Sequence, residues 1–136
     1  MTILLVEDNP GDQTLVREAL LPLPWIRLWF APDGTDALRM LEGPGGKPDL
    51  ILLDLNLPRL DGRALLLLLK SHPVLCRIPT IVMTSSVDPH EVARAYDAHA
   101  NCYLAKPPDF VRMEQLMRRL AEFWLEAACL PSAGEG

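Results

Sequence analysis

The stretch Leu50-Ile51-Leu52-Leu53-Asp54 decides the fold of this 136-residue chain. Four consecutive apolar residues between Pro48 and Pro58 are typical of a strand that is buried on both faces of a parallel sheet. In α/β proteins, ligands bind beyond the carboxyl ends of such strands. Asp54 closes the run, so the sequence places an ionisable carboxylate on a rigid support at the position where a protein of this class binds its ligand.

Two further apolar runs also end in charged residues. Ile3-Leu4-Leu5-Val6 precedes Glu7-Asp8, and Cys102-Tyr103-Leu104-Ala105 precedes Lys106. If the strands are parallel, three carboxylates and one ammonium group meet at one edge of the sheet. Carboxylates so placed repel one another unless a cation lies between them. Hard oxygen ligands without His or Cys favour Mg²⁺ or Mn²⁺ over Zn²⁺.

This combination of groups suits a phosphoryl transfer to Asp54. The carboxylate attacks, and the divalent ion and the lysine neutralise the transferred group. Few protein ligands leave coordination positions of Mg²⁺ free for water and for substrate oxygens. Thr84 ends a further predicted strand and can donate its hydroxyl to the same phosphoryl oxygens. The sequence therefore predicts an aspartyl-phosphate site.

Strands and helices alternate along the whole chain. The strands are expected at 2–6, 26–30, 50–54, 80–83 and 102–105, and the helices at 12–21, 33–41, 61–72, from 88 onward, and 109–129. Asp33, Asp61 and Asp88 are expected as helix caps. Right-handed crossovers then give an α/β fold with a doubly wound parallel sheet and helices on both faces. The length suits one domain, which we expect over residues 1–128 with a C-terminal tail over 129–136.

The bulk composition excludes several classes of protein. Hydrophobic residues make up 49% and charged residues 23%, which is typical of a globular chain. The net charge of −5 argues against a general electrostatic grip on nucleic acid. Three cysteines without a C-x-x-C pair argue against disulfides and structural zinc. No signal peptide and no bilayer-length apolar run is found, so we expect a cytoplasmic protein without nucleic-acid or membrane partners.

Four motifs together resemble the receiver domain of two-component response regulators. They are Val6-Glu7-Asp8-Asn9, Leu53-Asp54-Leu55-Asn56-Leu57-Pro58 with Asp61-Gly62, Thr84-Ser85-Ser86, and Tyr103-Leu104-Ala105-Lys106-Pro107. Each follows or closes a predicted strand, and the resemblance covers residues 1–128. It implies a flavodoxin-like, five-stranded sheet with strand order 2-1-3-4-5. The string from Val6 to Gly11, with the Thr84 motif, is most similar to single-domain regulators encoded beside bacterial phytochromes.

The resemblance implies how the site would hold a metal and a phosphoryl group. Asp54 would be the phosphoacceptor. Asp8, Asp54 and the backbone carbonyl of Asn56 would hold Mg²⁺, with Mn²⁺ as a substitute, and Glu7 would act through water. Glu7 replaces the more usual aspartate of the family, and its longer side chain should still reach. Lys106 would pair with the phosphoryl group.

The resemblance also implies a conformational switch. The Thr84 hydroxyl would move toward the phosphoryl group, and the Tyr103 ring would turn inward behind it. The Lys106–Pro107 bond matches one that is usually cis in the family. Three positions match residues that tune phosphoryl lifetime or access to the site: Asn56, Ser85 and Ser86.

Each candidate residue also has an ordinary structural interpretation. Glu7-Asp8 could cap the first helix, Asp54 could be a solvated loop acid, and Lys106 could be a surface lysine. Thr84 alone is more typical of a β-branched strand residue than of a switch. Without the family match, Tyr103 is equally well a core aromatic. The combination of these residues at strand ends favours the functional interpretation.

Three classes of function compete for this site. The first is a signalling switch that accepts a phosphoryl group from a sensor histidine kinase, for which a bacteriophytochrome is a candidate, and relays the signal by protein contact. A variant of it is an intermediate receiver that passes the group to a phosphotransfer protein. The second is a haloacid dehalogenase-type phosphatase, which needs a second Asp where this chain has Asn56, so we expect no enzyme. The third, a receiver used only for binding, would lack Asp54 or Lys106.

Two helices carry more apolar residues than a core-facing stripe needs. In the third helix, Leu67 and Leu68 remain after the core positions are filled. The last helix is apolar over more than one stripe, with Met113, Leu116, Met117, Leu120, Phe123, Trp124 and Ala127. We therefore expect a homodimer through the last helix, with Phe123 or Trp124 at its edge.

Overall fold

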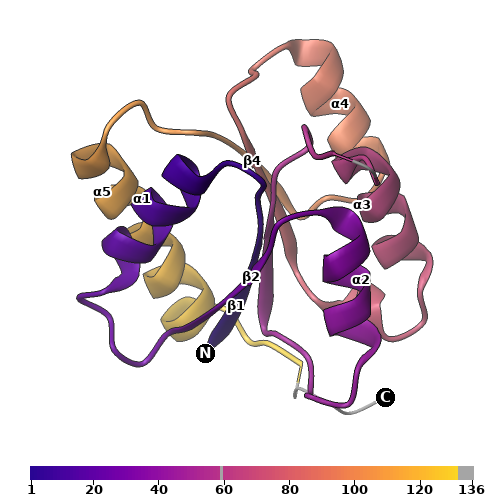
Figure 1. Cartoon of the computed structure of the whole chain (residues 1–136), viewed down its shortest axis with the longest axis horizontal. Coiled ribbons are helices and arrows are strands. Elements are labelled where there is room, and N and C mark those ends of the chain that lie inside the picture. Colours follow the sequence, from indigo (N-terminus) through magenta and orange to yellow (C-terminus); the bar gives the residue numbers. More distant parts are fainter. Residues whose placement is uncertain (59, 132–136) are drawn as a thin grey trace.

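Five parallel strands form the middle layer of the structure, and helices cover both faces of the sheet (Figure 1). The structure is a computed structural model that describes residues 1–58 and 60–131. The strands are β1 (Thr2–Val6), β2 (Arg27–Ala31), β3 (Leu50–Leu53), β4 (Thr80–Thr84) and β5 (Cys102–Ala105). Their order in the sheet is β2-β1-β3-β4-β5, which confirms the predicted doubly wound topology.

The helices divide into two layers. One face of the sheet carries α1 (Pro10–Leu20) and α5 (Phe110–Ala121), and the other carries α2 (Gly34–Glu42), α3 (Gly62–Ser71) and α4 (Pro89–Asp97) (Figure 1). Two short helices, η1 (Leu75–Arg77) and η2 (Glu122–Ala127), follow α3 and α5. None of the helices within residues 1–58 and 60–131 combines the length and the apolar character that a membrane span requires.

The unbroken apolar runs follow from burial on both faces. Alternate strand residues point to opposite faces of a sheet. In β1, Ile3 and Leu5 pack with α1 and α5, whereas Leu4 and Val6 pack with α2, α3 and α4. All four side chains are buried. A strand covered in this way has no polar face, which is why periodicity of two is absent from its sequence.

Side-chain caps fix where the helices begin. The three predicted caps are confirmed, because each side chain accepts a hydrogen bond from a backbone N–H of its helix at 2.8–2.9 Å: Asp33, Asp61 and Asp88. The first helix starts at Pro10, two residues earlier than predicted. Asn9 caps it by accepting from the Asp12 N–H at 3.1 Å, and Pro10 occupies a position that needs no N–H donor. Glu7 and Asp8 are therefore not the caps of α1.

The last helix differs from the prediction of one continuous helix over 109–129. Its α-helical part ends at Ala121, and the chain continues as the π-helix η2 to Ala127. The Ala128 N–H donates to the Phe123 carbonyl at 2.7 Å, five residues back, which is the π-helical spacing. Part of the predicted tail, residues 132–136, lies outside the described residues.

The third helix shows the predicted surplus of leucine. Leu65, Leu66 and Leu69 are fully buried against the sheet. Leu67 and Leu68 are 53% and 49% exposed. The helix thus follows the one-stripe rule, and its two remaining leucines lie on the surface.

Gly62 allows α3 to pack directly on the chain that follows β3. A Cβ at this position would lie 2.6 Å from the Leu55 Cα and 2.9 Å from the Leu55 carbonyl oxygen, and closer still to the carbonyl oxygen of Asp54. These are backbone atoms, so no side-chain rotation can relieve the overlap. We expect Gly62→Ala to lower the free energy of unfolding by about 2 kcal/mol or more, measured by urea denaturation.

Gly45→Ala is the matched control, because nothing lies within 4 Å of a Cβ at that position. Its effect should stay within about 0.5 kcal/mol. Equal losses of stability in the two variants would contradict the close approach at Gly62.

Candidate active site at the carboxyl edge of the sheet

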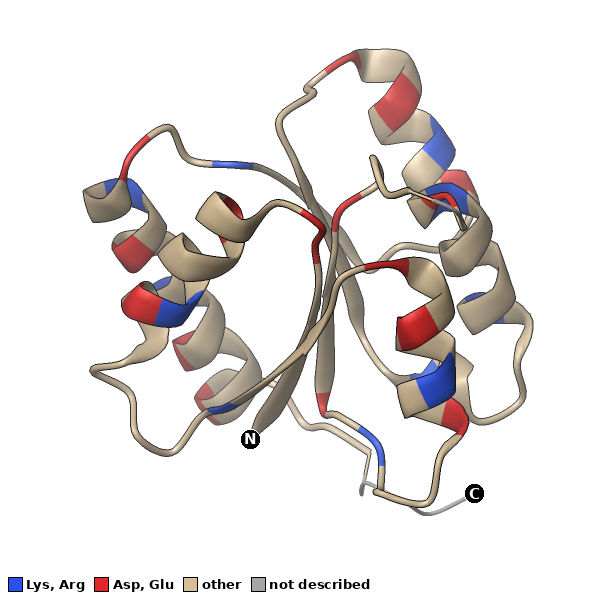
Figure 2. Cartoon of the chain, viewed as in Figure 1, with Lys and Arg blue, Asp and Glu red and all other residues tan. Residues whose placement is uncertain are grey.

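Charged side chains converge where β1, β3 and β5 end. Glu7 follows β1, Asp54 follows β3 and Lys106 follows β5. The Lys106 Nζ lies 2.5 Å from Glu7 Oε1 and 3.1 Å from Asp54 Oδ2. Figure 2 shows acidic segments at the ends of the central strands and a basic segment on the connection from β5 to α5. The parallel sheet therefore brings these residues together from distant parts of the chain.

A further carboxylate, Asp12, reaches the same lysine from α1. Its Oδ2 lies 2.8 Å from Lys106 Nζ. Sequence reasoning missed this residue because an acid in the first turn of a helix has an ordinary explanation in the helix dipole. One signal was present: Asp12 lies in the first turn of the helix that follows β1, only a few residues along the chain from Glu7 and Asp8.

Three carboxylates form a group that can hold a cation. Glu7, Asp8 and Asp54 each offer one oxygen, and these oxygens all lie within 4.8 Å of one another. Glu7 and Asp54 are buried, and Asp8 is exposed. The Glu7 Oε2 is buried and has no hydrogen-bond partner within residues 1–58 and 60–131. Oxygen donors with one buried oxygen unpartnered fit a hard divalent cation such as Mg²⁺ or Mn²⁺.

The protonation of these groups is coupled. Burial, together with the neighbouring Asp54, raises the pKa of Glu7 to about 8, although Lys106 opposes the shift. Burial acts to lower the pKa of Lys106, but its hydrogen bonds with Asp12, Glu7 and Asp54 outweigh burial and raise that pKa. In the metal-free protein at neutral pH, Glu7 is therefore largely protonated and Lys106 remains a cation.

Asn56 and Thr84 extend the polar site across β3 and β4. The Asn56 backbone N–H donates to Asp54 Oδ1 at 3.1 Å. The Asn56 side-chain amide donates to Thr84 Oγ1 at 3.5 Å, a long hydrogen bond. Thr84 is fully buried at the end of β4. Hydrogen bonds thus connect the phosphoacceptor candidate Asp54 to Asn56, and Asn56 to the Thr84 hydroxyl; we call these three residues the polar row.

Tyr103 connects β5 to the loop that follows Thr84. Its hydroxyl donates to the Ser86 backbone carbonyl at 2.8 Å, and its half-buried ring packs against the core on the α2–α4 face. Burial and the nearby Glu91 raise the pKa of this hydroxyl, so it stays a neutral donor. Ser85 is exposed and Ser86 is half-buried in the same loop.

Two further predicted features are the Lys106–Pro107 peptide bond and the aromatic pair Phe123 and Trp124. The Lys106–Pro107 peptide bond is trans, as are all peptide bonds that the structure describes, so the expectation of a cis bond is wrong here. The two forms of an X–Pro bond differ little in energy, and trans is the favoured one. Phe123 and Trp124 lie on η2 with their rings edge to face, 5.2 Å between centroids. Trp124 borders a small pocket with Met1 and Asp49, which precede β1 and β3, so it belongs to the opposite edge of the sheet.

Comparison with known proteins gives consistent matches over almost the whole chain. Residues 3–119 match the family model described as the response regulator receiver domain. The chain is 40% identical to the response regulator Rcp1 of Synechocystis sp. (strain ATCC 27184 / PCC 6803 / Kazusa), over 96% of this chain and 93% of Rcp1.

Solved structures share the fold closely. The phosphorylated cyanobacterial phytochrome response regulator RcpA superimposes with a TM-score of 0.89 at 40% identity, covering 96% of this chain and 98% of that one. The Mn²⁺-bound form of Rcp1 gives 0.87 at 39% identity, covering 96% and 99%. The receiver domain of the sensor histidine kinase PA1611 from Pseudomonas aeruginosa PAO1, with magnesium in its active site cleft, gives 0.75 at 32% identity, covering 91% and 96%.

These matches agree with the observed strand order and with a metal site at the group of Glu7, Asp8 and Asp54, which we call the acidic notch. The chain belongs to the response regulator receiver domain family.

Proposed function

We propose that this chain is a single-domain response regulator, formed by residues 1–128, that accepts a phosphoryl group on Asp54 from a sensor histidine kinase. One observation carries the proposal. The Asp54 carboxylate, 6% exposed at the end of β3, lies 3.1 Å from the Lys106 ammonium within a group of acids that fits a divalent cation. The similarity to Rcp1 along nearly its full length supports the single-domain form.

The chemistry follows from these positions. A carboxylate oxygen of Asp54 attacks the phosphorus of the kinase phosphohistidine, and the P–N bond breaks with its electron pair leaving on the imidazole. Lys106 neutralises oxygens of the transferred group. We place Mg²⁺, or Mn²⁺, on Asp8, Asp54 and the backbone carbonyl of Asn56, with Glu7 acting through water. When bound, the ion supplies further neutralisation of the developing charge, and the metal-bound relatives support this assignment.

The phosphoryl group would act on two neighbours. The Thr84 hydroxyl accepts from the Asn56 side chain, and we propose that it turns from Asn56 toward the new oxygens. We propose that the Tyr103 ring then turns inward behind Thr84 and gives up its present hydrogen bond to Ser86 in the loop after β4. Ser85, Ser86 and Asn56 would then tune the phosphoryl lifetime. The signal leaves as a change in the surface near this loop.

The same comparison supports a proposal for the partners. RcpA is described as a phytochrome response regulator, and we propose a phytochrome-type histidine kinase as the phosphodonor. The alternative within this class is an intermediate receiver that hands the group on to a phosphotransfer protein. A turnover phosphatase is disfavoured, because Asn56 stands where a general acid is needed and cannot titrate.

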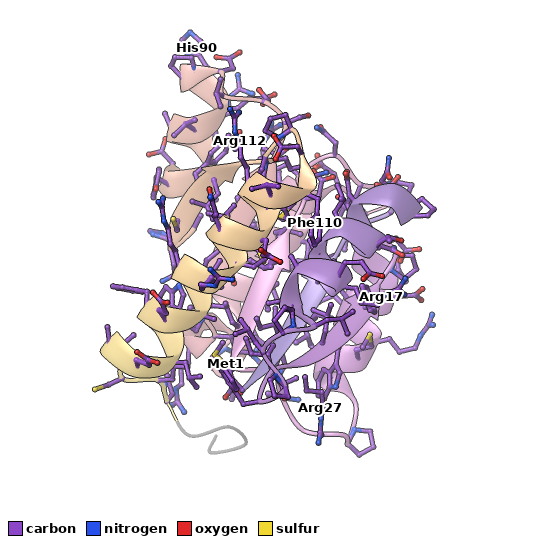
Figure 3. The ribbon with its side chains drawn as sticks, turned by 90° about the vertical axis from the view of Figure 1, so that its left-hand side faces the viewer. Met1, Arg17, Arg27, His90, Phe110 and Arg112 are labelled. Carbon is purple, nitrogen blue, oxygen red and sulfur yellow. The ribbon has the colours of Figure 1, made fainter. Side chains whose placement is uncertain are left out.

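We also propose a homodimer through α5 and η2. The Phe123 side chain is 56% exposed beside the half-buried Trp124. Both rings line a shallow pocket with Leu104, Leu116 and Leu120. α5 lies on the outer face of the molecule, turned toward the viewer in Figure 3. Contiguous exposed apolar surface of this kind commonly marks a protein interface.

The central prediction concerns Asp54. The wild-type chain, incubated with Mg²⁺ and acetyl phosphate, should gain the mass of one phosphoryl group as an adduct that is labile to base. Asp54→Asn should gain none, because an amide is not a nucleophile here. Asp36→Asn is the matched control, since Asp36 is a surface partner of Arg39 outside the site. An adduct of equal yield on Asp54→Asn would refute the assignment.

A second prediction concerns pH. The pKa of Glu7 rises to about 8 on folding, so the folded state binds this proton more tightly than the unfolded chain does. The stabilisation is complete below the ordinary Glu pKa of about 4.5 and is lost as pH rises through about 8. Without metal, the free energy of unfolding should fall by several kcal/mol across this range relative to Glu7→Gln, which cannot titrate, because each pKa unit corresponds to about 1.4 kcal/mol. Parallel pH profiles of the two proteins in urea denaturation would contradict the raised pKa.

A third prediction concerns assembly. The wild-type chain should sediment as a dimer at tens of micromolar. Phe123→Glu should convert it to a monomer, because a charge in an apolar contact is costly to desolvate. Leu67→Glu is the control on the other face of the molecule, where the side chain is similarly exposed. A monomeric wild type, phosphorylated or not, would remove this proposal.

A further inference from the structure

Asp12 is the charged residue at the site to which the proposed function gives no role. We infer that Asp12 is a positioning residue: it holds the Lys106 ammonium in the site while a divalent cation engages Asp54 directly and Glu7 through water. The inference rests on the proposed function, because it presumes the metal and phosphoryl chemistry at Asp54. It adds a residue and a task to that chemistry.

The contacts of Lys106 show how the task is divided. Its ammonium has three protons to donate, and oxygens of three acidic side chains accept them, at 2.5 Å for Glu7, 2.8 Å for Asp12 and 3.1 Å for Asp54. Glu7 and Asp54 also belong to the group of oxygens that fits a cation, and Asp12 does not. Asp12 is thus the lysine's one carboxylate, among the described residues, that the metal does not need.

Burial makes this third carboxylate important. The Lys106 side chain is 14% exposed, so water solvates the ammonium poorly. A divalent cation held by Asp54 directly and by Glu7 through water would compete with the ammonium for two of the lysine's partners and add a positive charge nearby. Without Asp12 the ammonium would be poorly solvated and would lack hydrogen-bond acceptors, which is strongly unfavourable for a buried charge. With Asp12 it keeps one charge-assisted hydrogen bond.

The backbone around Asp12 is well anchored. The Asp12 N–H donates to the capping side chain of Asn9 at 3.1 Å, and the Gln13 side chain donates to the Glu7 carbonyl at 2.5 Å. α1 and α5 lie side by side on one face of the sheet, so the step from α1 to the chain entering α5 is short (Figures 1 and 3). The carboxylate is therefore presented from a rigid element, as a positioning group requires.

The ordinary alternative is that Asp12 only complements the dipole of α1. That role needs a negative charge in the first helical turn and no contact with Lys106. The two interpretations separate in a double-mutant cycle with the lysine, because a dipole effect persists when Lys106 is removed and a positioning effect does not.

The test measures Mg²⁺ affinity by calorimetry at one pH and ionic strength. Asp12→Asn should weaken binding by about three- to tenfold, since the amide keeps the shape but loses the charge that holds the ammonium. Glu18→Gln is the matched control: it removes one negative charge from the same helix, at an exposed side chain for which the structure gives no contact with Lys106. It should change the affinity less than about twofold.

The cycle is completed in a Lys106→Met background. There, Asp12→Asn should have no more effect than Glu18→Gln, and urea denaturation of each variant verifies that it is folded. An undiminished effect of Asp12→Asn in that background, or equal affinities of Asp12→Asn and Glu18→Gln in the wild-type background, would overturn the inference alone. A wild-type chain that binds no Mg²⁺ would overturn the proposed function together with it.

Discussion

Charge compensation by Lys106 is the constraint on which this site depends. Val6 pairs with Leu53 in adjacent parallel strands, so the residues that follow them, Glu7 and Asp54, emerge at the same level of the sheet. Two buried carboxylates at such close range repel. The ammonium between them, and the proton that Glu7 retains, keep the notch intact without metal. A binding site for a doubly charged ion is therefore held ready by a singly charged side chain.

Most of the fold was predictable because its signals are local. Unbroken apolar runs indicate the buried strands. Helix starts are indicated by capping residues whose side-chain hydrogen bonds span only two or three residues: Asp33, Asp61 and Asp88. The convergence of Glu7, Asp54 and Lys106 followed from topology alone, since parallel strands end at one edge. These inferences need no knowledge of how side chains pack.

The features that escaped prediction depend on packing or on small energy differences. The contact of Asp12 with Lys106 joins residues 94 positions apart and depends on how far two side chains reach. After Ala121 the backbone changes from α-helical to π-helical hydrogen bonding, in which the acceptor lies five residues back instead of four. Helix propensities of single residues do not distinguish these two spacings. The Lys106–Pro107 bond is trans. The expectation of a cis bond rested only on what is usual in the resembled family.

The surroundings of Asp54 are mechanically unequal. On the β3 side, the Gly62 N–H donates to the Leu55 carbonyl at 3.2 Å, and helix and loop touch backbone to backbone. On the β4 side, the loop is held by a side-chain bond from Tyr103 to Ser86, which can be exchanged without unfolding anything. The β3 side of the site is therefore fixed by backbone packing, whereas the β4 side depends on one replaceable side-chain hydrogen bond. A change at the Asp54 carboxylate is therefore easier to accommodate on the side of β4 and α4 than on the side of α3.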